Sequence, residues 1–238
     1  MAVLLLRLAG PLQSWGDSSR FTQRLTRSEP TKSGVVGLLA AAQGRRRSDP
    51  IEDLAHLLFG VRVDQPGRIV RDFHTAIRWQ EPKRTSMPLS YRYYLADAVF
   101  VAGVSGDQNL LEGLNDALKN PSFPLYLGRR SCPLSGQVSL GVHDAELEEA
   151  LRQVPWQASA WHRRRQGKEI DLPLYLDVGA TTVTGDTVTE VVRDVPESFS
   201  PIRREYGWRE VVRVQPQRVH NPAGHDRDMD FMAVLGGA

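Results

Sequence analysis

The hydrophobic residues of this chain form unbroken runs in some segments and helical spacings in others, a pattern that predicts a mixed α+β protein. The run VLLLRLA at residues 3–9 is typical of a strand in the middle of a sheet. In residues 35–42 the apolar positions recur at i, i+3, i+4 and i+7, which predicts a helix with one buried face. We expect a second helix over residues 49–60 and an amphipathic helix over 107–120, capped by Asp107.

Further strands are expected between and after these helices. Residues 61–79 predict one or two strands around a turn at 65–67, residues 91–104 predict one strand, and residues 137–142 predict a closing strand. The resulting order βαββαβ over residues 1–145 is the ferredoxin-like arrangement shared by RNA-recognition folds. The aromatic signature of RNA-recognition motifs is absent, so loops and helix starts would have to bind any RNA.

Residues 146–238 are expected to form a β-rich extension packed on this core. A short acidic helix at 144–153 and a basic turn at Arg163–Arg165 lie among three apolar segments that predict a small antiparallel β subdomain. No low-complexity linker separates the two parts, so we expect them to pack together.

The composition supports a sizeable core, because 41% of the 238 residues are hydrophobic. The single cysteine, Cys132, cannot form an internal disulfide, which indicates a reducing compartment. No apolar run approaches the length of a membrane span. We therefore expect a cytoplasmic protein without a membrane partner.

The sequence contains no motif that predicts a cofactor or a metal site. The GxSxG, HExxH, Walker and paired-cysteine patterns are all absent. Asp226, Asp228 and Asp230 imitate the start of an EF-hand, but Phe231 stands where glycine is needed and Gly237 where the bidentate glutamate should be. Neither a cofactor nor calcium is therefore expected.

Charge is concentrated near the amino end. Residues 1–47 contain eight basic and two acidic residues, a net charge of +6, whereas the whole chain is +2. Of the 30 basic residues, 26 are arginines, which suits bidentate contact with phosphates, although a GC-rich genome would give the same bias. RNA is the leading candidate for a polyanionic partner.

The start of the first predicted helix is a candidate anion site. Thr31, Lys32, Ser33 and Gly34 offer backbone N–H groups, a cation and the positive end of the helix dipole. The alternative is that this helix start is capped and binds only water. A nucleotide P-loop is excluded, because it would need a glycine at Thr31.

Two other segments could contact RNA. Cations and aromatic residues are interleaved over 78–94, where a base-stacking surface and a hairpin whose tyrosines cover a sheet edge are both open. The residues concerned are Arg78, Lys83, Arg84 and Arg92, with Trp79, Tyr91, Tyr93 and Tyr94. The turn led by Gly128 carries Arg129 and Arg130, which could instead pair with surface carboxylates.

One histidine could act in catalysis. His74, beside Asp72 and near Arg71 and Arg78, could serve as a general acid or base in metal-independent RNA cleavage. No aligned nucleophile accompanies it. Binding without catalysis is the simpler interpretation, and endoribonuclease activity is the alternative.

Four ordered motifs carry a family resemblance. They are LRLAGPLQSWG at 6–16, EPTKSGVVGLLAAAQG at 29–44, RDFHT at 71–75 and YLGRRSCPL at 126–134. Together they resemble the CasD subunits of type I-E CRISPR Cascade complexes, which belong to the RAMP superfamily. Beyond residue 142 the similarity is limited to length and strand content.

The resemblance implies a modified ferredoxin-like core with a basic β-hairpin thumb at about residues 77–94. It also implies a subunit for antiviral defence that holds the 5′ handle of the CRISPR RNA and caps the row of backbone subunits. The large subunit that reads the PAM would be a second protein partner, and target DNA an indirect one. In a related subtype the equivalent subunit cleaves precursor RNA, which keeps the nuclease alternative open; a pure protein adaptor is a third possibility.

Residue reasoning and resemblance together give one set of expected RNA contacts. It comprises Gln13, Ser14, Trp15, Arg20, Arg24, Arg27, Thr31, Lys32, Ser33, Gly34, Arg78, Lys83, Arg84, Arg92, Gly128, Arg129, Arg130 and Ser131.

Overall fold

A computed structural model describes most of the chain, namely residues 2–16, 19–20, 22–79, 85–182, 188–200 and 202–225. The candidate contacts Lys83 and Arg84 lie outside the described residues, as do Asp226, Asp228 and Asp230. Within the described part, no helix is long and apolar enough to cross a membrane.

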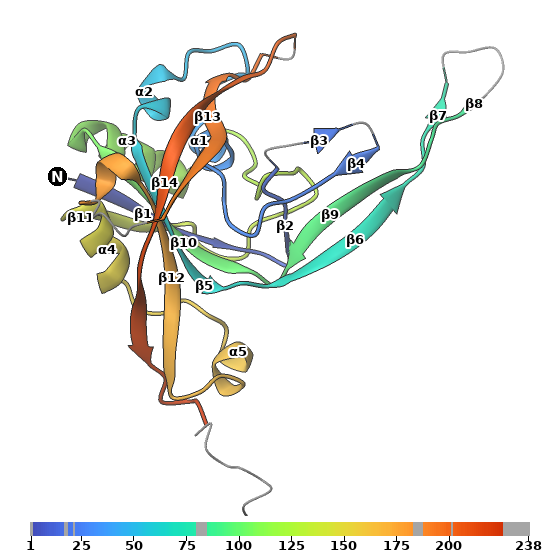
Figure 1. Cartoon of the computed structure of the whole chain (residues 1–238). Coiled ribbons are helices and arrows are strands. Elements are labelled where there is room, and N and C mark those ends of the chain that lie inside the picture. The colour runs from blue at the N-terminus through green and yellow to red at the C-terminus, as the bar shows by residue number, and fades with distance from the viewer. Residues whose placement is uncertain are drawn as a thin grey trace, which may run out of the picture.

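A seven-stranded antiparallel sheet forms the body of the protein, with the strand order β11-β1-β10-β5-β12-β14-β13 (Figure 1). The strands are β1 (Ala2–Ala9), β5 (Leu58–Gln65), β10 (Val99–Gly106), β11 (Ser139–Asp144), β12 (Glu169–Asp177), β13 (Thr189–Ser198) and β14 (Glu205–His220). The helices are α1 (Lys32–Ala42), α2 (Glu52–Ala55), α3 (Gln108–Lys119), α4 (Leu147–Gln153) and α5 (Ala160–Arg164), with a 3-10 turn η1 (Val178–Ala180).

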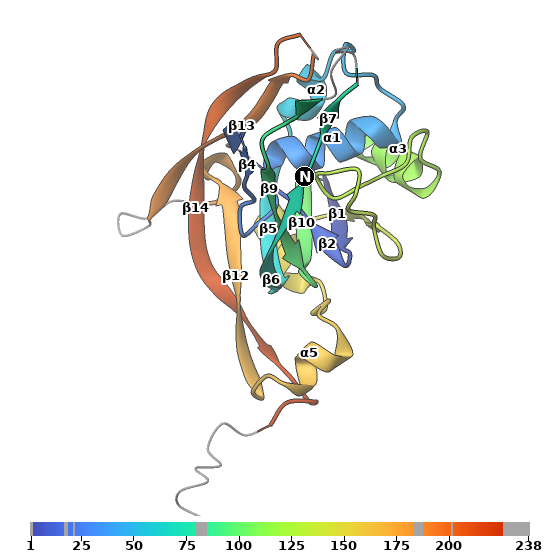
Figure 2. The same cartoon turned by 90° about the vertical axis from the view of Figure 1, so that its right-hand side faces the viewer.

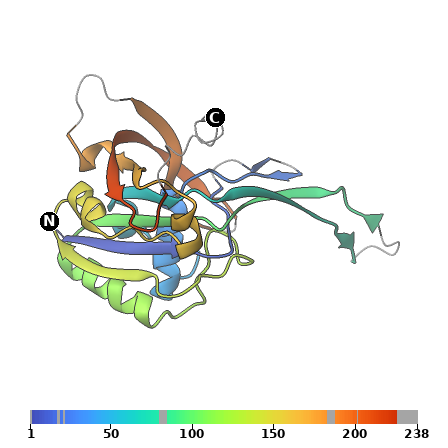
Figure 3. The ribbon, with the colours of Figure 1, turned by 90° about the horizontal axis from the view of Figure 1, so that it is seen from below.

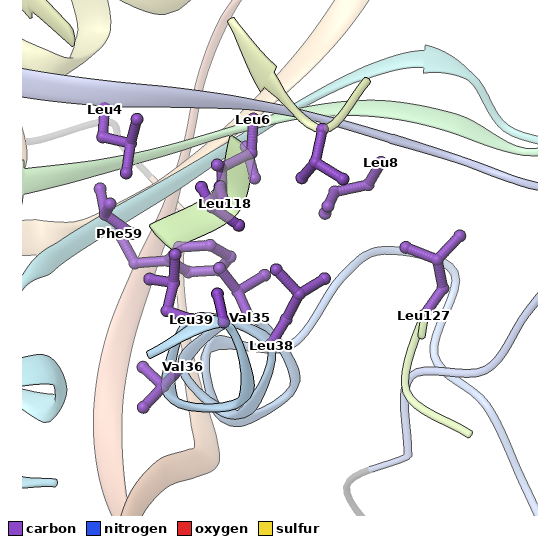
Figure 4. Packing of buried hydrophobic residues seen from close by; sticks show 14 of the residues in the cluster. Leu4, Leu6, Leu8, Val35, Val36, Leu38, Leu39, Phe59, Leu118 and Leu127 are labelled. Atoms are coloured by element: carbon purple, nitrogen blue, oxygen red, sulfur yellow. The ribbon is translucent and has the colours of Figure 1, made fainter. Parts of the chain in front are cut away.

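The two faces of the sheet carry separate cores, as the two-residue period of a strand requires. Leu4, Leu6 and Leu8 of β1 point to the face covered by α1 and α3, where they meet Leu39 and other apolar residues of α1 (Figure 4). Alternate residues of β1, such as Val3, pack with α4 on the opposite face. Figure 3 shows α3 and α4 on opposite sides of β1.

A long hairpin of β6 (Arg68–His74) and β9 (Ser90–Ala96) projects from this body, with the short pair β7 (Ile77–Arg78) and β8 (Thr85–Ser86) toward its tip (Figure 1). Its base joins a second sheet with β2 (Leu12–Gln13), β3 (Ser19–Arg20) and β4 (Gln23–Arg24). The hairpin therefore lies beside the basic amino-terminal segment.

Several predictions of local structure are confirmed. The helix expected at 35–42 is α1, and the amphipathic helix is α3, whose cap Asp107 accepts a hydrogen bond from the Leu110 N–H at 3.0 Å. The turn expected at 65–67 joins β5 to β6, with Gly67 at a φ of 73°.

Other predictions are wrong in extent. The strand expected over 91–104 is two strands, β9 and β10, separated at Asp97, which adopts a φ of 56°. The helix expected over 49–60 shrinks to the four residues of α2, because β5 already begins at Leu58. Gly60 does not end a helix but lies within β5, close against Leu176. The basic turn expected at Arg163–Arg165 is partly helical, because Arg163 and Arg164 are the last two residues of α5 and Arg165 is its C-cap.

The C-terminal strands do not form a small sheet of their own. Leu174, Tyr175 and Leu176 of β12 pair with β5, so β12, β14 and β13 continue the main sheet. The sequence pattern could not give this pairing, because strands pair through backbone N–H and C=O groups, which are the same in every apolar segment.

Candidate nucleic-acid interface

A groove of about 900 Å³ runs along α1, from Thr31 before its first residue to Arg47 beyond its last. Its charged lining consists of arginines, with no carboxylate among the described residues that line it: Arg24, Arg45, Arg46, Arg47, Arg129, Arg130 and Arg204. Aromatic rings line it as well, from Trp15, Phe123, Tyr126, Phe199 and Tyr206. Arginines beside aromatic rings suit a polyanion whose bases can stack.

The start of α1 forms one wall of this groove. Thr31 caps the helix by accepting the Gly34 N–H at 3.2 Å, while Ser33 and Gly34 line the groove. The Lys32 N–H is donated to the Oδ2 of Asp194 at 2.7 Å. The expectation that this helix start offers free N–H groups is therefore wrong for two of its donors.

Lys32 does not reach the groove with its side chain. The residue is 6% exposed, and its Nζ lies 3.3 Å from the Oδ2 of Asp177 in a buried ion pair. Burial of an ammonium is costly unless it is paired, so this pairing determines where the side chain points. The structure separates Lys32 from Thr31, Ser33 and Gly34, with which the sequence analysis grouped it.

The turn containing Gln13, Ser14 and Trp15 supports the groove from beneath. Gln13 is fully buried; its amide donates to the carbonyl of Ala98 at 2.7 Å and its oxygen accepts the Trp15 indole N–H at 3.0 Å. The Trp15 ring packs closely against the backbone of Gly34, so that a Cβ added to Gly34 would lie only 2.8 Å from the ring. Ser14 and Trp15 line the groove, whereas Gln13 lies behind them.

The loop at 128–131 contributes two arginines with different roles. Arg129 donates to the backbone carbonyls of Tyr93 at 3.2 Å and Arg24 at 2.8 Å, and its guanidinium lies 4.8 Å from the centre of the Tyr94 ring. Arg130 is exposed and has no hydrogen bond or ion pair within the described residues. The neighbouring Ser131 is also exposed and does not line the groove.

The amino-terminal arginines are likewise divided. Arg24 is exposed at the groove, whereas Arg27 pairs with Glu29 at 2.8 Å and with Glu190 at 2.9 Å outside it. Arg20 lies in β3. The sequence analysis assigned these arginines a single role, because the pattern does not show which of them meet a carboxylate.

The second group of expected contacts lies on the hairpin, outside the groove lining. Arg78 is in β7 and Arg92 in β9, where the Nε of Arg92 is buried without a hydrogen-bond partner in the described part of the chain. Tyr94 is 4% exposed and belongs to the core. Trp79, which the sequence analysis named, is 72% exposed, and Phe73, which it did not name as a stacking ring, is 62% exposed.

His74 lies at the end of β6, opposite Ser90 of β9. Its Nε2 is 3.0 Å from the Oδ2 of Asp72, and both side chains are exposed to solvent. Neither residue lines the groove. Among the described residues, no group of three or more His, Cys, Asp or Glu could hold a metal ion.

Comparison with known proteins identifies the family. Residues 3–212 match the model of the family described as CRISPR-associated protein (Cas_Cas5). The chain belongs to this CRISPR-associated family.

Three further relationships are consistent with this family. The chain is 35% identical over 160 residues to the CRISPR system Cascade subunit CasD of Escherichia coli (strain K12), covering 60% of this chain and 71% of that protein. A solved structure titled CRISPR RNA-guided surveillance complex contains a chain that matches with a TM-score of 0.74 and 32% identity over 98% of both chains. Another, titled crystal structure of Cas protein, matches with a TM-score of 0.67 and 40% identity over 94% of this chain and 98% of that one.

In this family member the sequence analysis missed several groove residues. Arg46 and Arg47 belong to the basic amino-terminal stretch, but nothing in their spacing distinguished them from Arg45. Arg45 is held by a bidentate pair with Asp53, and the hydrogen bond from Arg45 lowers the pKa of that carboxyl group.

Three further missed residues come from the connection between β13 and β14 and from the start of β14. Phe199, Arg204 and Tyr206 line the groove although they lie far along the chain from the motifs around α1. The sequence carries no pattern that would identify these residues as part of the groove. They reach it because β12 pairs with β5, which places β13 and β14 in the main sheet. Figure 2 shows β13 and β14 beside α1.

Proposed function

We propose that this chain is a non-catalytic CRISPR RNA-binding subunit of a type I-E Cascade surveillance complex. It holds the 5′ handle of the CRISPR RNA in the arginine-lined groove and caps the row of backbone subunits. The observation that carries the proposal is a groove lined by arginines and aromatic rings, with no carboxylate among its described lining residues, in a member of this CRISPR-associated family. The relationship to a protein named as a Cascade subunit supports the assignment to such a complex.

The chemistry of the groove favours single-stranded RNA. Arg24, Arg46, Arg47, Arg130 and Arg204 have no side-chain hydrogen bond or ion pair within the described residues, so their guanidinium groups are available to phosphates. Trp15 is fully buried and supports the groove from within. Four of the adjacent aromatic rings keep exposed surface and can stack on bases that are unpaired and turned outward, namely Phe123, Tyr126, Phe199 and Tyr206. A short single-stranded leader meets both conditions.

Two architectural inferences accompany this proposal. The strand order β11-β1-β10-β5, with α1 following β1 and α3 following β10, supports a ferredoxin-like core within residues 1–145. The β6–β9 hairpin supports the assignment of a thumb that includes the expected segment 77–94. Residues 146–238 are then an extension whose strands widen the core sheet.

The hairpin is the candidate contact with neighbouring molecules. Phe73 and Trp79 are apolar and largely exposed, which is typical of surface that another molecule covers. In the proposed complex these neighbours are the backbone subunit and the RNA that it carries, with the large PAM-reading subunit as a further partner. Target DNA would be reached only through them.

Binding of handle RNA by the full chain tests the proposal. The measurement is the affinity for a labelled 5′ handle RNA over a range of salt concentrations, beside an RNA of the same length and scrambled sequence. If four to six arginines meet phosphates, log affinity falls against log salt with a slope of about −0.7 per contact. Wild-type protein that prefers neither RNA and shows no salt dependence, alone or in the assembled complex, contradicts the proposal.

The alternative, metal-independent cleavage of precursor CRISPR RNA, rests on the 3.0 Å contact between His74 and Asp72. Incubation of the chain with repeat RNA in EDTA distinguishes the two functions. Cleavage at the handle that is lost in His74→Ala would support the enzyme, whereas intact RNA supports binding alone. A pure protein adaptor would protect no part of the RNA in the assembled complex near this subunit.

A further inference from the structure

Four charged residues lie directly behind the start of α1, of which Lys32, Asp177 and Asp194 are buried and Arg209 is partly buried. Asp177 at the end of β12 accepts from the Nζ of Lys32 at 3.3 Å and from the Phe59 backbone N–H at 3.0 Å. A guanidinium nitrogen of Arg209 lies 2.5 Å from the other oxygen of Asp177. The same Arg209 donates to both oxygens of Asp194, at 2.6 and 2.9 Å.

This cluster also forms a hydrogen bond with the backbone of α1. The Oδ2 of Asp194 accepts the Lys32 N–H at 2.7 Å, so a residue of β13 supplies a cap to the first residue of the helix. Asp194 is 1% exposed, and burial makes a hydrogen bond to a charged acceptor stronger than it would be in water. The helix start is thus tied to the C-terminal strands, which stand beside α1 in Figure 2.

The residues held by this cluster are directly followed by residues that line the groove. Ser33 and Gly34, the two residues after Lys32, line the groove, while Lys32 and its three charged partners do not. Any rotation or fraying of the first turn of α1 would move these two residues and the Thr31 cap together.

We propose that Lys32, Asp177, Asp194 and Arg209 are positioning residues for RNA binding, which hold the first turn of α1 against the groove without touching RNA. The inference rests on the proposed function, because these residues matter for RNA binding only if the groove binds RNA. It assigns Lys32 a role opposite to the phosphate contact that its sequence position suggests.

The charge balance of the cluster matters for a polyanion. Two carboxylates face two cations, so the cluster adds no net charge behind the groove. Lys32→Met removes one cation and leaves one uncompensated negative charge. A unit charge at about 10 Å in a medium of intermediate dielectric changes the affinity for a nearby phosphate by about fivefold.

The experiment compares Lys32→Met with Arg130→Ala in the full chain, using handle RNA and a salt series. Arg130→Ala, which removes an exposed groove cation, is expected to reduce the log-log salt slope by about 0.7, the value for one phosphate contact on single-stranded RNA. Lys32→Met is expected to weaken affinity by about fivefold while the slope stays close to that of the wild type. The double variant Lys32→Met with Asp177→Asn restores the charge balance but not the ion pair that holds the helix, so its affinity is expected to stay below that of the wild type. Full recovery would assign the loss to charge alone and would overturn the positioning role.

The outcomes separate three roles of Lys32. A slope reduced as in Arg130→Ala would make Lys32 a phosphate ligand and overturn the inference. Unchanged affinity of folded Lys32→Met, with only a lowered Tm, would make the cluster purely structural and would also overturn it. Absence of any handle binding by the wild-type chain would instead refute the proposed function, and melting curves of each variant ensure that folded proteins are compared.

Discussion

Gly128 lies so close to the Ser14 carbonyl oxygen that a Cβ on Gly128 would overlap that oxygen. Gly128 also adopts a φ of 81°, a region that other residues avoid. The contact joins the arginine-bearing loop to the Gln13–Trp15 turn, which the Ser14 N–H reinforces by donating to the Leu127 carbonyl at 3.1 Å. Backbone geometry therefore positions Arg129 and Arg130.

Gly128→Ala is expected to destabilise the protein and to displace this loop. The positive φ and the clash with backbone together should lower the free energy of unfolding by about 2 kcal/mol or more. Gly113→Ala is the matched control, because its Cβ would meet nothing within 4 Å in the middle of α3. That control should gain about 0.5–1 kcal/mol in urea unfolding; equal effects of the two substitutions would contradict the account.

Arg129→Ala and Arg130→Ala should affect different properties. Arg129→Ala leaves the carbonyls of Tyr93 and Arg24 without their donor and removes the stacking on Tyr94, so we expect a loss of about 2 kcal/mol in stability. Arg130→Ala should change stability by less than about 0.5 kcal/mol, as is usual for exposed residues. Thermal unfolding of both variants checks this, and a larger loss in Arg130→Ala would show that its side chain supports the fold.

Gln13→Leu should cost stability although the shape of the side chain is nearly preserved. The Ala98 carbonyl and the Trp15 indole N–H would each lose a partner in a fully buried position, at about 1–3 kcal/mol for each group. The added double variant Gln13→Leu with Trp15→Phe removes the orphaned N–H and separates the two contributions. Urea unfolding of the wild type, Gln13→Leu, Trp15→Phe and the double variant measures the coupling. Independent effects would mean that the Gln13–Trp15 bond contributes little.

His162 should make stability fall in mild acid. Burial beside Trp156 and Trp161, whose rings lie 6.2 and 5.6 Å from it, lowers the pKa of His162 below its ordinary 6.5. The folded state therefore binds its proton less readily than the unfolded state, so this contribution is complete above about pH 6.5 and is lost as the pH falls further. In His162→Phe, Tm should depend less on pH between 7.5 and 5.5, whereas exposed His56→Gln serves as the control; an unaltered dependence in His162→Phe would refute the assignment.

Local patterns predicted much of the fold because the strongest elements depend on near neighbours. The i, i+3, i+4 spacing and caps located α1 and α3, and the unbroken apolar run located β1. The break at Asp97 escaped prediction, since a non-glycine residue with positive φ has no distinctive neighbours. The pairing of β12 with β5 escaped it because strand partners are chosen by long-range contacts.

The candidate site was predictable as a region but not in its roles. Charge density drew attention to two segments, and the structure brings Thr31, Ser33 and Gly34 of one and Gly128, Arg129 and Arg130 of the other to the same groove. The sequence could not show that Lys32 and Arg27 meet carboxylates or that Arg129 holds backbone carbonyls. Whether the groove residues bind RNA stays a prediction until the affinities are measured.

The hydrogen bond from Lys32 to Asp194 spans 162 positions of the chain. During synthesis, the ribosome must therefore release β13 before the first turn of α1 can be completed. A nascent chain that already displays most of its amino-terminal arginines still lacks a completed helix start. Under the proposed function, such a chain would not bind cellular RNA prematurely, before the polypeptide is nearly whole.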